Sequence, residues 1–431
     1  MTGNRQQTRP TPGERRAAAS TSTSTSTSTS TSTSTSTSMS TRWRVSVEVL
    51  QGHWDVVEER PGGEGVPAGL VARGWDGFLL GLSDGEVEAH EIAGLEGDWG
   101  GAPEGLRALA AAAREVCALE VMDVPPMREM ARKKLTVRKA AQVDAFAAVA
   151  LPVARRAGRV LDVGCGHGHL TRELAERLEL PVLGLERDAA LAARARALPT
   201  TATAAPVFQL SDVLRDGLAL RADDLVIGLH ACGELGDTMV EAAARVGAAL
   251  VLVGCCLQKR RGPVRRSLAG GTMLELPTAL LGLSNLSPGD DGVETSRADN
   301  LAARQRRLAL HHLLTRTAEP TLPLGAELDG LNRRSAQHEL AMLAARAFAL
   351  RALPPPTPAD LAAAATWAAH HHARARRLAL PRALLARVLE VHVLCDRALH
   401  LEQSGHTVRH GTLWPRSVSP RNLALLATRF S

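Results

Sequence analysis

The stretch RVLDVGCGHGHLTRELAERL, residues 159–178, decides the fold, because a glycine-rich turn joins a short apolar run to a helical segment. Strand, glycine turn and helix in this order are typical of the nucleotide site of an open α/β sheet. Glycine suits such a turn because a side chain would keep a ligand away from the backbone. Gly164, Gly166 and Gly168 give G-x-G-x-G, whereas the dinucleotide fingerprint needs glycine at position 169, where this chain has histidine. The spacing therefore argues against a dinucleotide.

An acidic residue, Asp162, precedes the first of these glycines by two positions. The resulting D-x-G-x-G-x-G pattern resembles motif I of the class I S-adenosylmethionine-dependent methyltransferases. The resemblance implies S-adenosylmethionine as cofactor, with the turn lying under its methionine and ribose parts. Tight turns that bind nothing have similar sequences, so the later strands must decide between a cofactor site and a purely structural turn.

Four further apolar runs, PVLGLE, VFQLSDV, DDLVIGLHACGELGD and AALVLVGCC, alternate with helical segments. This alternation predicts an α/β fold with a doubly wound, Rossmann-like parallel sheet, in which ligands bind at the carboxyl ends of the strands. HTVRHGTLWP and NLALLATRF fit the hairpin that adds a seventh strand to a class I methyltransferase sheet. Glu186 ends the second run, 20 residues after Gly166, where a carboxylate can accept both ribose hydroxyl hydrogens. The predicted cofactor-binding residues are Asp162, Gly164, Gly166, Gly168, Glu186, Ser211, Asp212 and His230.

A more specific resemblance comes from the pairing of LHACGELGD with VGCC, preceded by RKAAQV and followed by SPRNLALLATR. Together these segments resemble the methyltransferase domain of the glutathione S-transferase C-terminal-domain-containing proteins and their bacterial relatives, over roughly residues 133–431. The resemblance implies a class I methyltransferase with S-adenosylmethionine as cofactor, but it does not identify the methyl acceptor. Some related domains have Tyr or His after the paired cysteines, where this chain has Leu257 and Gln258.

Changes in composition divide the chain into three parts. Residues 1–41 contain an alternating Ser/Thr tract without apolar residues for a buried face, and we expect a disordered low-complexity tail. Alternating runs such as RWRVSVEVL and DGFLLGL, with a helical segment after them, predict a small α+β accessory domain at 42–121. The methyltransferase domain is expected at 128–431, with a helical insertion at about 300–401. This insertion either walls the acceptor side of the site or is bulk core.

Three cysteines follow the fourth and fifth predicted strands, at positions 232, 255 and 256. They allow three interpretations: small packing residues, ligands that bind a soft metal together with His230, or a thiolate that attacks C6 of a pyrimidine. We favour packing that shapes the acceptor pocket, because adjacent cysteines are awkward ligands for one ion. If the acceptor must lose a proton, His230 and Glu234 are the candidate bases. The candidate catalytic residues are His230, Cys255 and Cys256.

The other polar candidates have plain structural explanations. His167 and His169 can face solvent or cap a helix, and Cys165 fits a tight turn as a small residue. We read the triplet His370, His371 and His372 as solvated surface, Cys117 and Cys395 as core, and Lys259, Arg260, Arg261, Arg265 and Arg266 as a solvated loop or a phosphate contact.

The amino-acid composition argues against some classes of function and of location. The formal charge is +6, aromatic residues make up 3% and tyrosine is absent, so a base-stacking platform for single-stranded nucleic acid is poorly supplied. Six scattered cysteines and the lack of a long apolar stretch predict a cytoplasmic protein without a membrane partner. We expect an S-adenosylmethionine-dependent methyltransferase with an unidentified acceptor, RNA being the first hypothesis. The alternatives are a catalytically inactive cofactor-binding or RNA-associated module and a Cys/His metal-binding regulatory protein; the sequence does not indicate an oligomeric state.

Overall fold

The computed structural model of the chain describes residues 38–62, 65–125, 135–200, 202, 204–271, 274–286, 296–317 and 322–429. Most of the predicted low-complexity tail, residues 1–37, lies outside the described residues. Helix α1 (Met39–Gly52) starts earlier than the tail was expected to end, because the Ser38 hydroxyl accepts the Thr41 N–H and caps it.

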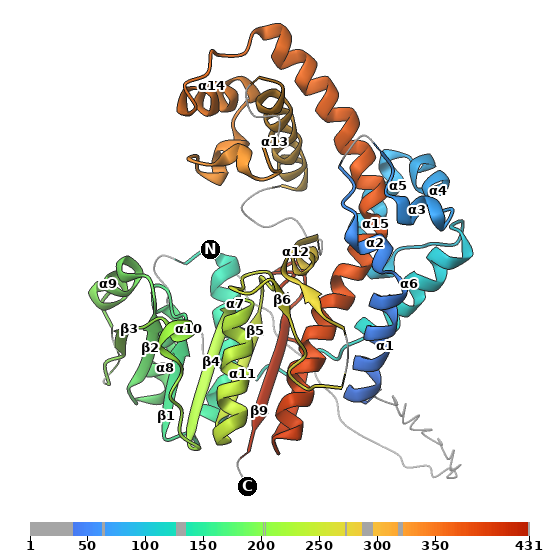
Figure 1. Ribbon diagram of the computed structural model, residues 1–431. Coiled ribbons are helices and arrows are strands. Elements are labelled where there is room, and N and C mark those ends of the chain that lie inside the picture. The colour runs from blue at the N-terminus through green and yellow to red at the C-terminus, as the bar shows by residue number, and fades with distance from the viewer. Residues whose placement is uncertain are drawn as a thin grey trace, which may run out of the picture. The chain divides into compact units, whose positions relative to one another are not determined.

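A seven-stranded sheet forms the centre of the molecule, in the order β3-β2-β1-β4-β5-β9-β8 (Figure 1). The first five strands of this order pair in parallel, and β9 is antiparallel to both β5 and β8. The doubly wound sheet and its terminal hairpin are therefore confirmed. The strands are β1 (Arg159–Val163), β2 (Val182–Glu186), β3 (Val207–Leu210), β4 (Asp224–Ala231), β5 (Ala249–Gly254), β8 (Thr407–Thr412) and β9 (Leu423–Thr428).

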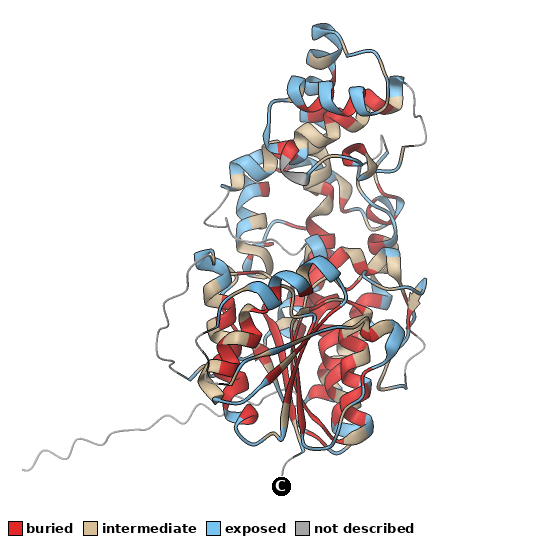
Figure 2. Ribbon diagram, turned by 90° about the vertical axis from the view of Figure 1, so that its left-hand side faces the viewer, coloured by how far each residue is buried: buried red, intermediate tan, exposed pale blue. Residues whose placement is uncertain are grey.

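Helices cover both faces of this sheet (Figures 1 and 2). Successive residues of a strand point to opposite faces, so a strand covered on both sides is apolar along its whole length. Val160 and Leu225 face a core that includes α7 and α8, whereas their neighbours Leu161 and Val226 face a core that includes α11 and α15. The helices that join the parallel strands or cover them are α7 (Val137–Ala154), α8 (His169–Leu178), α9 (Ala189–Ala197), α10 (Val213–Asp216), α11 (Glu234–Val246) and α15 (Pro358–Gln403).

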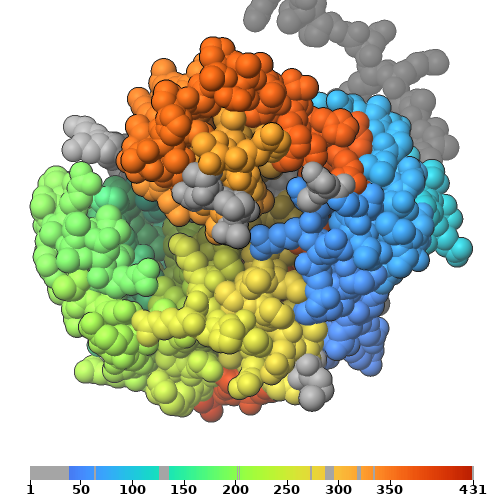
Figure 3. Space-filling view, turned by 45° about the horizontal axis from the view of Figure 1, so that its top comes forward, coloured from blue at the N-terminus to red at the C-terminus, as the bar shows by residue number. Residues whose placement is uncertain are grey.

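The segment between β5 and β8 is mainly helical in the part that the structure describes. A small hairpin of β6 (Val264–Arg265) and β7 (Leu276–Pro277) comes first, followed by α12 (Thr278–Leu281), the 3-10 helix η2 (Gly282–Leu286), α13 (Arg297–Thr317) and α14 (Leu340–Leu350). Helices α13 and α14 share a separate apolar core with the first part of α15, which includes Leu310, Phe348 and Ala364. Figure 3 shows the helices of this region in orange and the segment that directly follows β5 in yellow. Among the described residues, no helix combines the length and apolar character that crossing a membrane requires.

The chain before the sheet is helical, so the strands predicted within 42–121 are wrong. The residues RWRVSVEVL lie in α1, and the first six residues of DGFLLGL form α4, which Leu82 follows. The helices are α1, α2 (Trp54–Glu58), α3 (Ala68–Ala72), α4 (Asp76–Gly81), α5 (Asp84–Ala93) and α6 (Glu104–Cys117), with the 3-10 helix η1 (Gly94–Glu96) after α5.

Two buried polar residues explain why the residues of α1 were wrongly predicted to form a strand. Arg42 and Ser46 lie on the buried face at helical spacing, although their polarity suggested a solvent face. Arg42 donates to the Val116 carbonyl at 2.6 Å, and the Ser46 hydroxyl bonds to His392 Nδ1 at 2.9 Å. Long-range partners thus allow polar side chains on the core side of the helix, so the apolar alternation does not mark the buried face.

A buried charge cluster joins α11, β6 and α15 behind the carboxyl ends of β4 and β5. The Asp237 carboxylate accepts from Arg265 at 3.1 Å, from Arg397 at 2.9 Å and from Arg260 at 2.5 Å. Although burial opposes ionisation, the charges of Arg265 and Arg397 hold the pKa of Asp237 well below its usual range. Arg265 also donates to Asp396 at 2.7 Å and is only 2% exposed, which corrects the expectation of a solvated loop at this position.

We expect Asp237→Ala to lower the free energy of unfolding by roughly 3–5 kcal/mol, because it leaves Arg265 and Arg397 buried without a shared carboxylate. Urea unfolding followed by circular dichroism measures the change. Asp216→Ala is the matched control, because Asp216 forms an exposed ion pair with Arg215. Equal unfolding midpoints for the two variants would contradict a stabilising role of the cluster.

Candidate active site

The glycine turn after β1 has a backbone conformation that favours glycine. Gly164, Gly166 and Gly168 have φ values of 74°, 57° and 70°, all in the left-handed region. A Cβ at Gly168 would collide with the ring of Phe208, whereas a Cβ at Gly166 would meet no atom within 4 Å. The turn is therefore closed on one side by packing and open at its middle residue.

Glu186, at the end of β2, faces this turn. Its Oε2 accepts the Gly166 N–H at 2.9 Å, and its Oε1 accepts the Asp188 N–H at 2.9 Å. The side chain is buried, with the residue 8% exposed. An ionised carboxylate has about four acceptor positions, so roughly two remain for hydroxyl groups of a ligand.

Asp162 supports the turn from inside the protein. It is 2% exposed, and its Oδ2 accepts the Thr171 hydroxyl of α8 at 2.7 Å. Burial raises the pKa of Asp162 to about 6, with the nearby Glu186 carboxylate adding to the shift. The observed contact is thus between the end of β1 and the first turn of α8.

Ser211 and Asp212 follow β3 beside the same turn. The Ser211 N–H donates to the Glu186 carbonyl at 2.9 Å, which places the two strand ends next to each other. Asp212 caps α10 through the Leu214 N–H at 3.2 Å, and it forms an ion pair with Arg261 at 3.2 Å. The structure therefore brings these two predicted residues together with Glu186.

His230 has a strained backbone at the end of β4. Its φ is 67°, and the pairing of β4 with β5 shifts register between Leu229 and Ala231. Positive φ is uncommon in residues other than glycine, and such strain gathers at functional sites. Burial, together with the charges of Arg138, Lys139 and Arg421, lowers the pKa of His230 to about 4. The ring is therefore neutral at neutral pH.

Gln142 is a site residue that the sequence interpretation missed. It is 5% exposed on α7, and its Oε1 lies 3.1 Å from His230 Nε2. Its amide nitrogen has no hydrogen-bond partner among the described residues, which leaves a buried donor beside the strained histidine. The available signal was a polar residue on the buried face of an apolar helix, within the quoted segment RKAAQV.

The three cysteines at positions 232, 255 and 256 come together, with their Sγ atoms within 4.8 Å of one another. Cys232 and Cys255 both direct their thiols to the His230 carbonyl, at 3.1 and 3.5 Å. The hydrogen bond from Cys255 lowers the pKa of Cys232 to about 6, whereas the same contact and burial raise the pKa of Cys255. The adjacent cysteines reach one point because β5 ends at Gly254 and the chain turns there. His230 is not part of this group in the described chain, since its Nε2 contacts Gln142.

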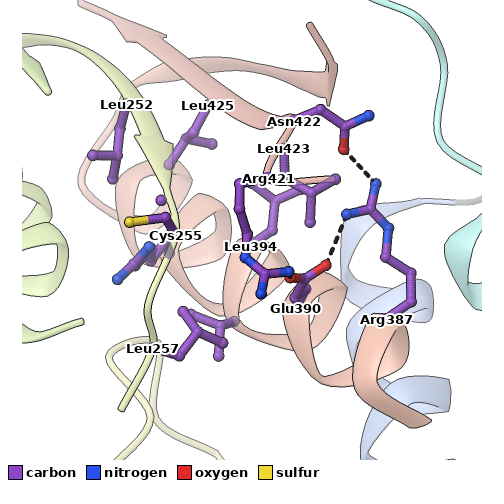
Figure 4. Close-up of a pocket in the computed structure, with 13 residues that line it drawn as sticks. Leu252, Cys255, Leu257, Arg387, Glu390, Leu394, Arg421, Asn422, Leu423 and Leu425 are labelled. Atoms are coloured by element: carbon purple, nitrogen blue, oxygen red, sulfur yellow. Dashed lines mark hydrogen bonds and ion pairs between the residues drawn. The ribbon is translucent and has the colours of Figure 1, made fainter. Parts of the chain in front are cut away.

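A small cavity behind Cys255 is separate from the glycine turn (Figure 4). Its volume is about 30 Å³, enough for a water molecule and too small for a nucleoside. Arg387 bonds to Glu390 and Asn422 at its edge, both at 2.8 Å. Figure 4 shows the Cys255 sulfur turned away from these charged groups.

The remaining candidates differ in how far they are buried. Cys395 is buried in the core as expected, and burial raises the pKa of Cys165 in the turn to about 12. The carboxylate of Glu234 accepts the Arg261 N–H at 2.7 Å and so holds a loop. The histidine triplet is not simply solvated surface, because the ring of His371 stacks on Trp367 with 3.9 Å between the ring centroids. The ring of His312 on α13 also stacks on Trp367, with 4.0 Å between the centroids.

Parts of the chain are similar to a known family and to a solved structure. Residues 138–262 match the family model described as a methyltransferase domain, a range that includes β1 to β5, the glycine turn and the three cysteines. This part of the chain is therefore a methyltransferase domain, and it lies in a Rossmann-like α/β sheet; methyltransferases in general use S-adenosylmethionine as methyl donor. Among solved structures, a sugar N-methyltransferase, KedS8, from Streptoalloteichus sp ATCC 53650 matches with 22% identity and a TM-score of 0.22. That match covers 34% of this chain and 65% of that protein.

The raised pKa of Asp162 predicts a pH dependence of stability. Between about pH 4 and 6 the unfolded chain releases this proton while the folded chain keeps it, so stability falls as pH rises through this range. Asp162→Asn cannot ionise, and its stability should therefore gain about 2–3 kcal/mol relative to wild type between pH 4 and 7. Urea unfolding of both proteins at each pH measures the difference. A difference that stays constant with pH would contradict the raised pKa.

Proposed function

We propose that the glycine turn and Glu186 bind S-adenosylmethionine at the carboxyl ends of β1 and β2. The observation that carries the proposal is the open backbone at Gly166, directly beside a buried carboxylate with free acceptor positions. When bound, the cofactor supplies a methyl group already activated by its sulfonium. The residues assigned to binding are Asp162 as support of the turn, then Gly164, Gly166, Gly168, Glu186, Ser211 and Asp212, with His230 at the boundary to the acceptor.

We propose that the acceptor lies at the carboxyl ends of β4 and β5, beside His230 and Gln142. With Nε2 bonded to the Gln142 carbonyl, the Nδ1 atom of the neutral imidazole is the position that takes a proton from the acceptor. The buried amide nitrogen of Gln142 is a donor that an acceptor oxygen or nitrogen would satisfy. Most of the rate would come from alignment of the acceptor, since little covalent work falls to the protein.

RNA is the acceptor we propose first. Two exposed cations, Lys259 and Arg266, follow β5 at the same edge, and Arg266 is 84% exposed at its side chain. The chain carries a formal charge of +6. Contacts from lysine and arginine to phosphate supply affinity that weakens with salt.

We expect Glu186→Ala to weaken the binding of S-adenosylhomocysteine by roughly 1.5–3 kcal/mol, the usual effect of losing hydrogen bonds to a charged group. Isothermal titration calorimetry measures the affinity, and the urea midpoint of the variant reports whether the turn stays folded. Glu241→Ala, which removes an exposed carboxylate on α11, is the matched control and should bind like wild type. Unchanged affinity in Glu186→Ala would remove this residue from the site.

The acceptor is tested with methyl-labelled S-adenosylmethionine and a fractionated cell lysate. We expect label in the RNA fraction, with incorporation that decreases as salt is added, because phosphate contacts release counterions. Label in protein or small molecules instead would contradict RNA as acceptor and leave methyl transfer intact. If the protein binds S-adenosylhomocysteine and labels no fraction, the alternative of an inactive binding module is favoured.

A further inference from the structure

The thiols of Cys232, Cys255 and Cys256 form a cluster at the carboxyl ends of β4 and β5. All three residues are partly buried and free of disulfides, and their sulfur atoms lie within 4.8 Å of one another. Packing alone does not require the sulfurs to converge, since small apolar residues would fill the same two strand ends. The convergence is therefore the feature that needs an explanation.

The two turns that carry these cysteines are fixed to each other by the backbone. The Glu234 N–H donates to the Lys259 carbonyl at 3.1 Å, and the Lys259 N–H donates to the Cys256 carbonyl at 3.1 Å. Gly233 lies so close to the Lys259 carbonyl that a Cβ there would collide with it. The sulfur positions are thus held before any ligand arrives.

Charge near the cluster suits an anionic group. Arg397 is buried and donates to the Gly233 carbonyl at 3.0 Å, next to Cys232, and it lies close to Gly254, next to Cys255. Three thiolates around one divalent cation carry a net charge of −1, and the buried cluster beside them holds three arginines, Arg260, Arg265 and Arg397, against the carboxylates of Asp237 and Asp396. The surplus positive charge of this cluster therefore compensates the negative charge of a thiolate–metal group.

We propose that Cys232, Cys255 and Cys256 bind one soft divalent metal ion of the zinc class. Thiolate is the ligand type that such ions prefer. Zinc–sulfur bonds of about 2.3 Å in tetrahedral geometry place the sulfurs about 3.8 Å apart, a spacing that small side-chain rotations reach from the observed cluster. The protein supplies three ligands and leaves the fourth position for water or for the acceptor, as catalytic zinc sites do.

The metal alone tests the proposal, with the full-length protein purified in a reducing, metal-free buffer. Titration with Co²⁺ should give near-ultraviolet thiolate-to-metal absorption that saturates at one equivalent, disappears when Zn²⁺ is added and is accompanied by proton release. We expect each of three serine variants to weaken the binding of Co²⁺ by at least ~100-fold, because each removes one of only three protein ligands. The variants are Cys232→Ser, Cys255→Ser and Cys256→Ser. Cys117→Ala, a cysteine of α6 outside the cluster, should bind like wild type.

Two results would overturn the proposal. One is the absence of thiolate absorption in the wild-type protein, a measurement that does not depend on any variant being folded. The other is a Co²⁺ signal that survives in all three serine variants, or that falls as much in Cys117→Ala. The proposal does not rest on S-adenosylmethionine binding, because the titration contains no cofactor; a negative calorimetric result with S-adenosylhomocysteine would leave it unaffected.

Discussion

The carboxylate of Asp237 makes the interaction on which the site depends, because it joins two arginines of the segment after β5 to a third on α15. Of these, Arg397 comes from α15, more than a hundred residues further along the chain, and also donates to the Gly233 carbonyl. Removing water from these charges costs several kcal/mol per ion, and the hydrogen bonds that they make inside the protein offset this cost. The result is a fixed position for the turn that follows β4. The C-terminal part of α15, which follows the helical insertion, is thus part of the support of the active site.

The carboxyl edge of the sheet divides into two halves at the point where the strand order reverses between β1 and β4. One half holds the open glycine turn and Glu186, and we assign it to the methyl donor. The other half holds His230, Gln142 and the thiol cluster, and we assign it to the acceptor. His230 lies in the second half and contacts residues on two sides. Its carbonyl points toward the thiols of Cys232 and Cys255 and its ring toward Gln142 of α7, and its φ is positive. In the function we propose, donor and acceptor would therefore meet at the switch point, where open α/β sheets bind their ligands.

The sheet, the glycine turn and the residues at the strand ends could be predicted from the sequence, because strands buried on both faces are continuous apolar runs and the turn favours glycine. The N-terminal helices, Gln142 and Arg265 could not. Each depends on a buried polar side chain whose partner is distant in the chain: Ser46 with His392, Gln142 with His230, Arg265 with Asp396. The local pattern of polar and apolar residues predicts that such side chains face solvent. The cysteine cluster could be predicted in part. The sequence showed that the three cysteines follow two strand ends, but it did not show that their sulfur atoms converge.

Hydrogen–deuterium exchange with and without saturating S-adenosylhomocysteine tests the central claim most directly, because it reads every backbone amide of the carboxyl edge in one experiment. The account predicts slower exchange at residues 164–168, 186–188 and 211–214, where the turn after β1 and the ends of β2 and β3 meet. Residues of α13 and α14, whose core is separate from that of the sheet, should exchange unchanged. Protection confined to those two helices, or bound ligand with no protection at 164–168, would contradict the assignment of the glycine turn as the cofactor site.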